Sequence, residues 1–315
     1  KNFMKYRILS IVLIYLICIC IIKSTLAENV EKPEFSFGVI ADVQYCDCDD
    51  AYEENKYFRS SLKKLTECVQ DFNSKDLAFV IQLGDFIEQD LSSFDDLLPI
   101  YQQLKMPKYH VLGNHDFSVT GEEKKKVLKK LGLKKGYYDF TYQSWRFIVL
   151  NGTDISLYAT SRDSDKFKKA EVIFQDLKEG GFPSTLAVNG ALSKKQIAWM
   201  KDTLDKASNS GEKVILFCHH PIFPQSEFNL WNNTELINIF ESYDCVVAYM
   251  NGHNHLGSYE TKNGIHYLTF QGMLLTPDKN TYSIIEVYKE HLKVVGYGRV
   301  PSRVLHIKQV NLLNK

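Results

Sequence analysis

The stretch VLGNHD, residues 111–116, places a glycine, an amide, an imidazole and a carboxylate directly after a short apolar run. An apolar run that stops at such residues is typical of a buried strand with an abrupt end. Burying several polar side chains in a row beside a core costs free energy unless these side chains bind a partner there. Several other strands of the chain are predicted to end in the same way.

Around this stretch, short apolar and β-branched runs alternate with longer segments of helical spacing, which predicts an α/β layered fold. Strands are predicted at residues 35–41, 77–83, 108–112, 145–150, 213–218, 245–250 and 265–270, with a closing hairpin at 283–300. Helices are predicted at residues 53–71, 91–104, 122–130, 164–178, 193–206 and 234–241. Because no repeat or linker-like segment follows residue 33, we expect one domain over residues 33–310.

Five of the predicted strands end in clusters of polar side chains. The clusters are Asp42 and Gln44 in ADVQ, Asp85 in LGD, Asn114 and His115 in LGNHD, His219 and His220 in FCHHP, and His253 and His255 in NGHNH. Ligands of α/β sheets bind beyond the carboxyl ends of the strands, so these side chains are expected to converge. One such residue alone is more often a turn former, a helix cap or a core histidine. The five clusters together predict a site.

The ligand types in these clusters indicate a metal centre. Two carboxylates, at least three imidazoles and side-chain amides form a mixed oxygen and nitrogen set, which suits manganese, iron or zinc rather than calcium. The set is too large for one ion. Asp85 is expected to bridge two divalent ions, because one carboxylate can lie between cations about 3.5–4 Å apart. Such a pair of ions clamps phosphate oxygens, so the sequence predicts metal-assisted hydrolysis of phosphoesters.

The motifs D-x-Q, GD, GNHD, H-x-P and GHxH occur in this order over about residues 36–256 and resemble those of the calcineurin-like metallophosphoesterases. The resemblance implies a four-layer α/β/β/α sandwich. It assigns one metal ion to Asp42, Gln44, Asp85 and His255, and the other to Asp85, Asn114, His219 and His253. It also implies that His115, paired with Asp116, stabilises the transition state or protonates the leaving group.

A narrower resemblance accounts for Gln44, which stands where most of this superfamily has histidine. ADVQY (41–45), NGALSKKQIAWM (189–200) and GYGRVPSRVL (296–305) are among the segments similar to the manganese-dependent ADP-ribose/CDP-alcohol diphosphatases. This resemblance implies cleavage of the pyrophosphate of ADP-ribose, CDP-alcohols or related compounds to a nucleoside monophosphate and a second phosphate. Purple acid phosphatases have a tyrosine ligand where this chain has Glu88, so a tyrosinate-bound ferric ion is not expected.

Substrate contacts are predicted only from their position near the motifs. His220 follows the predicted ligand His219 and is expected behind it or facing the substrate. Tyr45 and Trp231 are candidates for binding a nucleobase, and Arg303 for meeting a phosphate. For each aromatic residue, packing in the core is the alternative.

Two other functions are compatible with the sequence. The same two-metal site would also serve a broader phosphomonoesterase or phosphodiesterase, including one for cyclic nucleotides. A non-catalytic scaffold with this fold would be expected to lose the bridging ligand or His115, and this chain keeps both Asp85 and His115. Substrate profiling separates the first alternative from the diphosphatase.

The N-terminus is predicted to be a secretory signal peptide over residues 1–27. A basic start precedes the apolar run 8–22, and small residues follow in STLA (24–27). Fifteen apolar residues are fewer than the roughly 20 that span a bilayer, so an uncleaved anchor is the less favoured reading. We therefore expect an exported protein, periplasmic, extracellular or luminal, without stable membrane insertion.

Charge and cysteine content restrict the partners further. The chain has 38 basic and 38 acidic residues, and four of the basic ones lie in residues 1–27. The remainder is therefore slightly acidic, which argues against nucleic-acid binding and leaves a small nucleotide as the expected partner. Cys46, Cys48, Cys68, Cys218 and Cys245 follow the signal peptide, and five cysteines leave at least one thiol free in a monomer. The oligomeric state is not predicted.

Overall fold

The computed structural model describes residues 31–308, and the predicted signal peptide lies outside this range. The chain divides after Pro33, and all elements below belong to the unit that begins at Glu34. Among residues 31–308, no helix is both long and apolar enough to cross a membrane.

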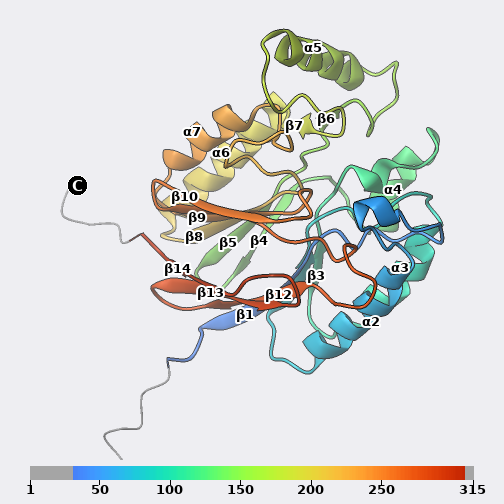
Figure 1. The fold of residues 1–315 in the computed structure, drawn as a ribbon. Coiled ribbons are helices and arrows are strands. Elements are labelled where there is room, and N and C mark those ends of the chain that lie inside the picture. The colour runs from blue at the N-terminus through green and yellow to red at the C-terminus, as the bar shows by residue number, and fades with distance from the viewer. Residues whose placement is uncertain (1–30, 309–315) are drawn as a thin grey trace, which may run out of the picture. The chain divides into compact units, whose positions relative to one another are not determined.

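Two six-stranded mixed sheets form the centre of the described unit (Figure 1). In spatial order, the first contains β14 (Arg303–His306), β13 (His291–Tyr297), β12 (Tyr282–Val287), β1 (Phe35–Ile40), β2 (Phe79–Gln82) and β3 (Lys108–His110). The second contains β10 (Ser258–Lys262), β11 (Ile265–Thr269), β9 (Val246–Asn251), β8 (Lys213–Phe217), β5 (Trp145–Val149) and β4 (Tyr138–Tyr142). Strands β1, β2 and β3 run parallel, as do β5, β8, β9 and β11. The carboxyl ends of each parallel set therefore share one edge.

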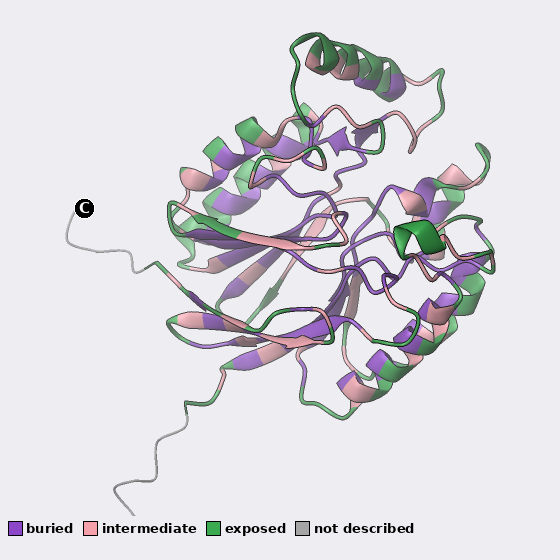
Figure 2. Cartoon of the chain, viewed as in Figure 1, coloured by how far each residue is buried: buried purple, intermediate pink, exposed green. Residues whose placement is uncertain are grey.

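Helices cover the outer face of each sheet (Figure 1). The first sheet carries α2 (Ser60–Asn73) and α3 (Ser93–Tyr101), and the second carries α6 (Lys194–Asn209) and α7 (Asn233–Glu241). One apolar cluster lies between the two sheets, and a further cluster lies between each sheet and its helices. Figure 2 shows the same burial in both sheets and on the inner helix faces. The predicted four-layer α/β/β/α sandwich is confirmed.

The alternation of side chains along β1 explains how one strand serves two layers. Phe37 and Val39 point into the cluster between the sheets, whereas Ile40 points toward the helices. Gly38 also lies on the helix side, where a Cβ would stand 2.8 Å from the ring of Phe72 on α2. A strand buried on both faces reads as a continuous apolar run, which is the pattern that predicted it.

The remaining elements lie around these layers. The short helices are η1 (Tyr52–Glu54), η2 (His115–Phe117), η3 (Lys124–Lys126) and α4 (Val127–Lys130). A two-stranded sheet, β6 (Ile155–Ser156) and β7 (Gly190–Ala191), carries α5 (Asp165–Glu179), whose first turn is capped by the Ser164 hydroxyl accepting from the Phe167 backbone N–H. Cys46 and Cys48 form a disulfide, and Cys68, Cys218 and Cys245 are free.

Most predicted elements are present, and the differences have local causes. The hairpin predicted at 283–300 forms β12 and β13. The helix predicted from residue 53 begins only at Ser60, because the chain turns at Asn55 with a φ of 55°. The helix predicted at 122–130 is reduced to one turn of α4 after η3. Strands β4, β10 and β14 were not predicted; each has exposed or half-buried residues and lies at a sheet edge, where the apolar signal is weak.

Candidate metal centre

The backbone at the candidate site is strained in the way that tight turns at strand ends require. Asp42, Gln44, Asp85 and His253 all have positive φ values, between 48° and 68°. Non-glycine residues with positive φ cluster at functional sites, where the surrounding structure holds them. Here they direct their side chains beyond the ends of β1, β2 and β9 at the common edge of the two sheets.

Two glycines allow the backbone to pass close to the carboxylates. A Cβ on Gly113 would stand 2.2 Å from Asp85 Oδ1, and one on Gly252 would stand 2.7 Å from Asp42 Oδ2. Neither position tolerates a side chain without displacing an acidic residue of the site. Glycine is therefore needed at these positions of the LGNHD and NGHNH motifs because a side chain would collide with Asp85 or Asp42.

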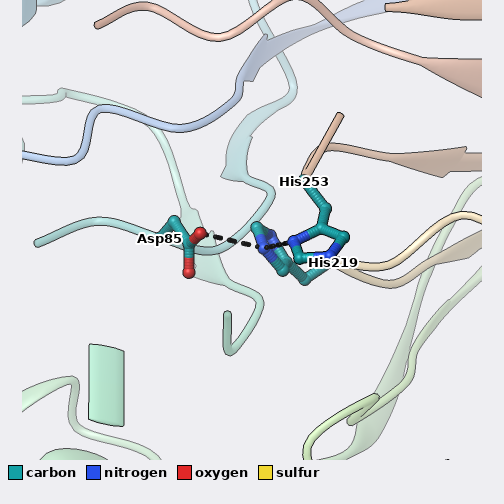
Figure 3. A group of neighbouring side chains, drawn as sticks. All are labelled: Asp85, His219 and His253. Atoms are coloured by element: carbon teal, nitrogen blue, oxygen red, sulfur yellow. Dashed lines mark hydrogen bonds and ion pairs between the residues drawn. The ribbon is translucent and has the colours of Figure 1, made fainter. Parts of the chain in front are cut away.

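Two groups of side chains offer ligand atoms that lie within 4.8 Å of one another, and they share Asp85. One group is Asp85, His219 and His253, and the other is Asp42, Asp85 and His255. Figure 3 shows the first group, with the Asp85 carboxylate and the His253 ring on either side of His219. His219 Nε2 lies 3.1 Å from Asp85 Oδ2 and 3.2 Å from His253 Nδ1. In the second group, His255 Nε2 lies 3.7 Å from Asp42 Oδ1.

The two predicted amide ligands complete these groups. Asn114 Oδ1 lies 3.1 Å from His219 Nε2, on the side of the first group. The Gln44 side chain is fully buried, its Nε2 donates to Glu88 Oε2 at 2.5 Å, and its Oε1 has no hydrogen-bond partner. The amide oxygen is therefore left for another ligand.

Unsatisfied buried atoms show that the site fits divalent cations. Asp42 Oδ2 and Gln44 Oε1 are buried and accept no hydrogen bond from the described residues, and among these residues the buried Asp85 Oδ2 is approached only by His219 Nε2, at 3.1 Å. Buried polar atoms without partners are rare and costly, and a cation at each group would satisfy these three. The oxygen and nitrogen ligand set is one that manganese, iron or zinc accepts.

The electrostatics of the site also fit divalent cations. Burial raises the pKa of Asp42, the nearby His219 lowers it in part and the Asp85 carboxylate raises it again, so that the pKa is about 7. Burial lowers the pKa of His219, but the carboxylates of Asp85 and Asp42 raise it more, to about 9. The carboxylates thus favour a positive charge among them, which is the electrostatic property of a cation site.

The predicted catalytic histidine has a different carboxylate partner from the one expected. His115 Nδ1 lies 3.1 Å from Glu88 Oε2 and 3.1 Å from the Glu88 carbonyl oxygen, and its Nε2 makes no hydrogen bond with any described residue. Asp116 is fully buried and accepts from the backbone N–H groups of Phe86 and Gly113. The predicted pairing of His115 with Asp116 is wrong, because the Asp116 carboxylate ties the two ligand-bearing loops together instead.

The structure places the predicted substrate contacts as follows. His220 is fully buried, 4.4 Å ring to ring from His253, with Nε2 3.2 Å from the Val188 carbonyl oxygen. It therefore lies behind the ligands. The Tyr45 hydroxyl donates to Asp96, and the Trp231 ring N–H donates to the Leu186 carbonyl. Arg303, on the edge strand β14, stacks on the ring of Tyr259 on β10. These last three side chains are not brought together with the ligands.

Three residues at the site were missed from the sequence. Glu88 stands where purple acid phosphatases have a tyrosine ligand, and in the structure it contacts both Gln44 and His115. Asn189 Oδ1 lies 3.0 Å from His253 Nε2. The half-buried Phe228 ring stands edge-on to His253 with centroids 5.7 Å apart. Their partners lie far away in the sequence, so no local pattern indicated these contacts.

Comparison with known proteins agrees with this geometry. The family model of the calcineurin-like phosphoesterases matches residues 35–257. The manganese-dependent ADP-ribose/CDP-alcohol diphosphatase of Arabidopsis thaliana is 33% identical over 301 residues, covering 86% of this chain and 96% of that protein. Its Homo sapiens counterpart is 29% identical over 323 residues, covering 87% and 93%.

A solved structure supports the fold independently. A dimetal phosphatase from Danio rerio superimposes with a TM-score of 0.79 at 23% identity, covering 88% of this chain and 100% of that one. Fold, ligand order and the family match therefore agree. The chain belongs to the calcineurin-like phosphoesterase family.

Proposed function

We propose that this metal-dependent hydrolase is a manganese-dependent diphosphatase, which cleaves the pyrophosphate of ADP-ribose, CDP-alcohols or related compounds to a nucleoside monophosphate and a second phosphate. The observation that carries the proposal is the pair of ligand groups that share Asp85. The substrate class is supported by the relatives named above, which are matched over most of their length.

The residues of the chain divide the chemistry between them. When bound, the two metal ions supply positive charge for the phosphate oxygens and lower the pKa of the attacking water. Asp85 holds the two ligand groups together, and Glu88 holds the His115 ring through Nδ1. His115 Nε2 is thus available to protonate the oxygen that leaves when the water oxygen bonds to phosphorus.

The surroundings of the site support a substrate with an apolar part beside its phosphates. Phe228 contacts His253, Leu256 directly follows His255 and is 71% exposed, and Val188 directly precedes Asn189 and is 42% exposed. Exposed apolar side chains beside a polar centre suit a nucleobase or the alcohol part of a diphosphate.

The test uses residues 28–315, stripped of metal and incubated with ADP-ribose or CDP-choline plus manganese or magnesium. Product chromatography is expected to show nucleoside monophosphate with manganese and little with magnesium. Hydrolysis of a generic phosphate ester without cleavage of either pyrophosphate would reject the diphosphatase and favour the broader phosphoesterase on the same site.

We further propose that the protein is exported and that residues 1–27 are removed. The basic start, the apolar run and the small residues at 24–27 support this proposal. Expression of the full chain in secretory cells is expected to release a protein whose N-terminal sequence begins at Glu28. Retention in the membrane fraction with the N-terminus intact would overturn it.

A further inference from the structure

Asn189 is a fully buried amide at the end of the segment that joins α5 to β7. Its Nδ2 donates to two backbone carbonyls, those of Ser184 at 3.1 Å and Glu227 at 2.7 Å. Its Oδ1 lies 3.0 Å from His253 Nε2. One side chain thus joins two surface segments to a ligand of the metal centre.

These contacts fix which end of the amide faces the histidine. A backbone carbonyl can only accept, so both carbonyls require the NH₂ end of Asn189. The oxygen end is left for His253, and an oxygen can only accept from a ring N–H. His253 therefore carries its proton on Nε2, and its lone pair is on Nδ1.

The lone pair of His253 then points into the site. Nδ1 lies 3.2 Å from His219 Nε2, inside the group that Asp85, His219 and His253 form. We propose that Asn189 is a positioning residue that fixes the Nε2–H tautomer and the ring orientation of His253, so that Nδ1 is presented to a metal ion. The partner of the other imidazole in this group is a backbone carbonyl, since His219 Nδ1 lies 2.9 Å from the Leu83 oxygen.

The position of Asn189 is itself fixed by its neighbours. A Cβ on Gly190 would stand 2.3 Å from the Gly152 carbonyl oxygen, so the chain after Asn189 is pressed against another loop. The Gly190 carbonyl also accepts from the Trp231 backbone N–H at 2.8 Å. The amide oxygen is therefore held in place before any metal binds, which is what a preorganised ligand requires.

Asn229 provides a matched control for the hydrogen bonds that Asn189 donates to backbone carbonyls. It is also fully buried, and its Nδ2 donates to the carbonyls of Ile222 and Pro224, both at 3.1 Å. Its Oδ1 accepts from the Ser226 hydroxyl at 2.8 Å, and it has no contact with a metal ligand. Asn229→Ala removes comparable loop contacts and takes away no hydrogen bond of a histidine.

The experiment compares manganese binding to metal-free wild type, Asn189→Ala, Asn189→Asp and Asn229→Ala by calorimetric titration, without substrate. Asn189→Ala is expected to lose about 10- to 100-fold in affinity for one manganese ion, the usual effect of removing such a partner. Asn189→Asp keeps an acceptor for His253 but places a carboxylate oxygen against the carbonyls of Ser184 and Glu227, so it is expected to lose less affinity than Asn189→Ala. Asn229→Ala is expected to bind like wild type while its metal-free melting temperature falls.

The inference rests on the two-metal site of the proposed function, and the same titration separates their failures. Wild type that binds no manganese would reject the proposed function. Wild type that binds two ions, with Asn189→Ala binding them equally well or Asn189→Asp losing as much as Asn189→Ala, would overturn the role of Asn189 alone.

A measurement on the wild-type chain covers the case in which the variants do not fold. Long-range ¹H–¹⁵N spectra of metal-free protein report the tautomer of each neutral imidazole, with His253 assigned by its absence from the spectrum of His253→Gln. The Nε2–H form is expected for His253, and the Nδ1–H form would overturn the proposal.

Discussion

The two ligand groups share Asp85 but differ in burial and support. The inner half-site, which consists of Asn114, His219 and His253 with Asp85, contains two buried imidazoles, each of which has a partner for its second nitrogen. The outer half-site consists of Asp42, Gln44 and His255 with Asp85. The His255 side chain is 16% exposed, and its ring makes no hydrogen bond with any described residue.

This difference in support predicts that one metal ion is held more firmly than the other. An imidazole whose second nitrogen is bonded has a fixed tautomer and orientation, and it binds a metal better than a free one. Each half-site contains one neutral amide ligand, Asn114 in the inner and Gln44 in the outer, so the difference lies in the support of the imidazoles. We expect the inner ion to bind first and the outer ion to exchange more readily.

The change expected to have the largest effect removes the residue common to both half-sites. Asp85→Asn takes away the one carboxylate that, among residues 31–308, belongs to both groups, so neither metal ion is expected to bind and turnover is expected to vanish. Calorimetric titration with manganese, together with product chromatography, measures both effects. Retention of two manganese ions by this variant would disprove the sharing of Asp85.

The next largest effect separates proton transfer from metal binding. His115→Ala leaves all ligands in place and is expected to bind both manganese ions, while kcat falls about 10²- to 10⁴-fold through loss of the general acid. Glu88→Gln is the companion variant, since it removes the carboxylate that faces His115 Nδ1 and is expected to change the pH profile of kcat. An unchanged kcat in His115→Ala would show that His115 is not the general acid.

The residues of this site that the sequence predicts are those that directly follow a strand. Asp42, Asp85 and His219 each follow an apolar run, and the common edge of parallel strands brings such positions together whatever the loops do. The same argument gave the layers, because runs such as 35–40 are buried on both faces.

The supporting residues could not be found in that way. Glu88 contacts Gln44 across 44 positions and Asn189 contacts His253 across 64, so neither pairing leaves a periodic or local trace. Asp116 shows the opposite error. It follows His115 directly, but the turn of η2 directs its carboxylate to the backbone of residues 86 and 113 instead of the neighbouring ring.

A smaller effect distinguishes the two half-sites directly. His255→Ala is expected to lose only the outer manganese ion, and excess manganese should recover kcat because water can enter the exposed ligand position. His219→Ala removes a fully buried ligand and should not be recovered. The measurement is kcat against manganese concentration, with His291→Ala on β13 as a histidine variant outside the site. Equal recovery of both variants would remove the distinction between the half-sites.

The smallest expected effect is on stability without metal. The pKa of His219 is raised from 6.5 to about 9, so the stability from its protonation is complete below about pH 6.5 and is lost as the pH rises toward 9. Asp42, with its pKa raised to about 7, acts in the same direction, because its buried carboxylate ionises as the pH rises to neutrality. The lowered pKa values of His253 and His255 act in the opposite direction, but their effect fades as the pH rises above about 6.5, because the unfolded chain then loses its own histidine protons.

Between pH 6.5 and 8, metal-free protein is therefore expected to lose stability as the pH rises. With saturating manganese the slope should flatten or reverse, because the metal ions replace the protons and bind better once these have left. Melting temperatures at the two pH values, with chelator or with manganese, measure the difference, and Asp85→Asn should show a weaker slope without metal. If the metal-free protein instead gains stability over this range, Asp42 and His219 do not hold their protons more tightly in the folded state than in the unfolded chain.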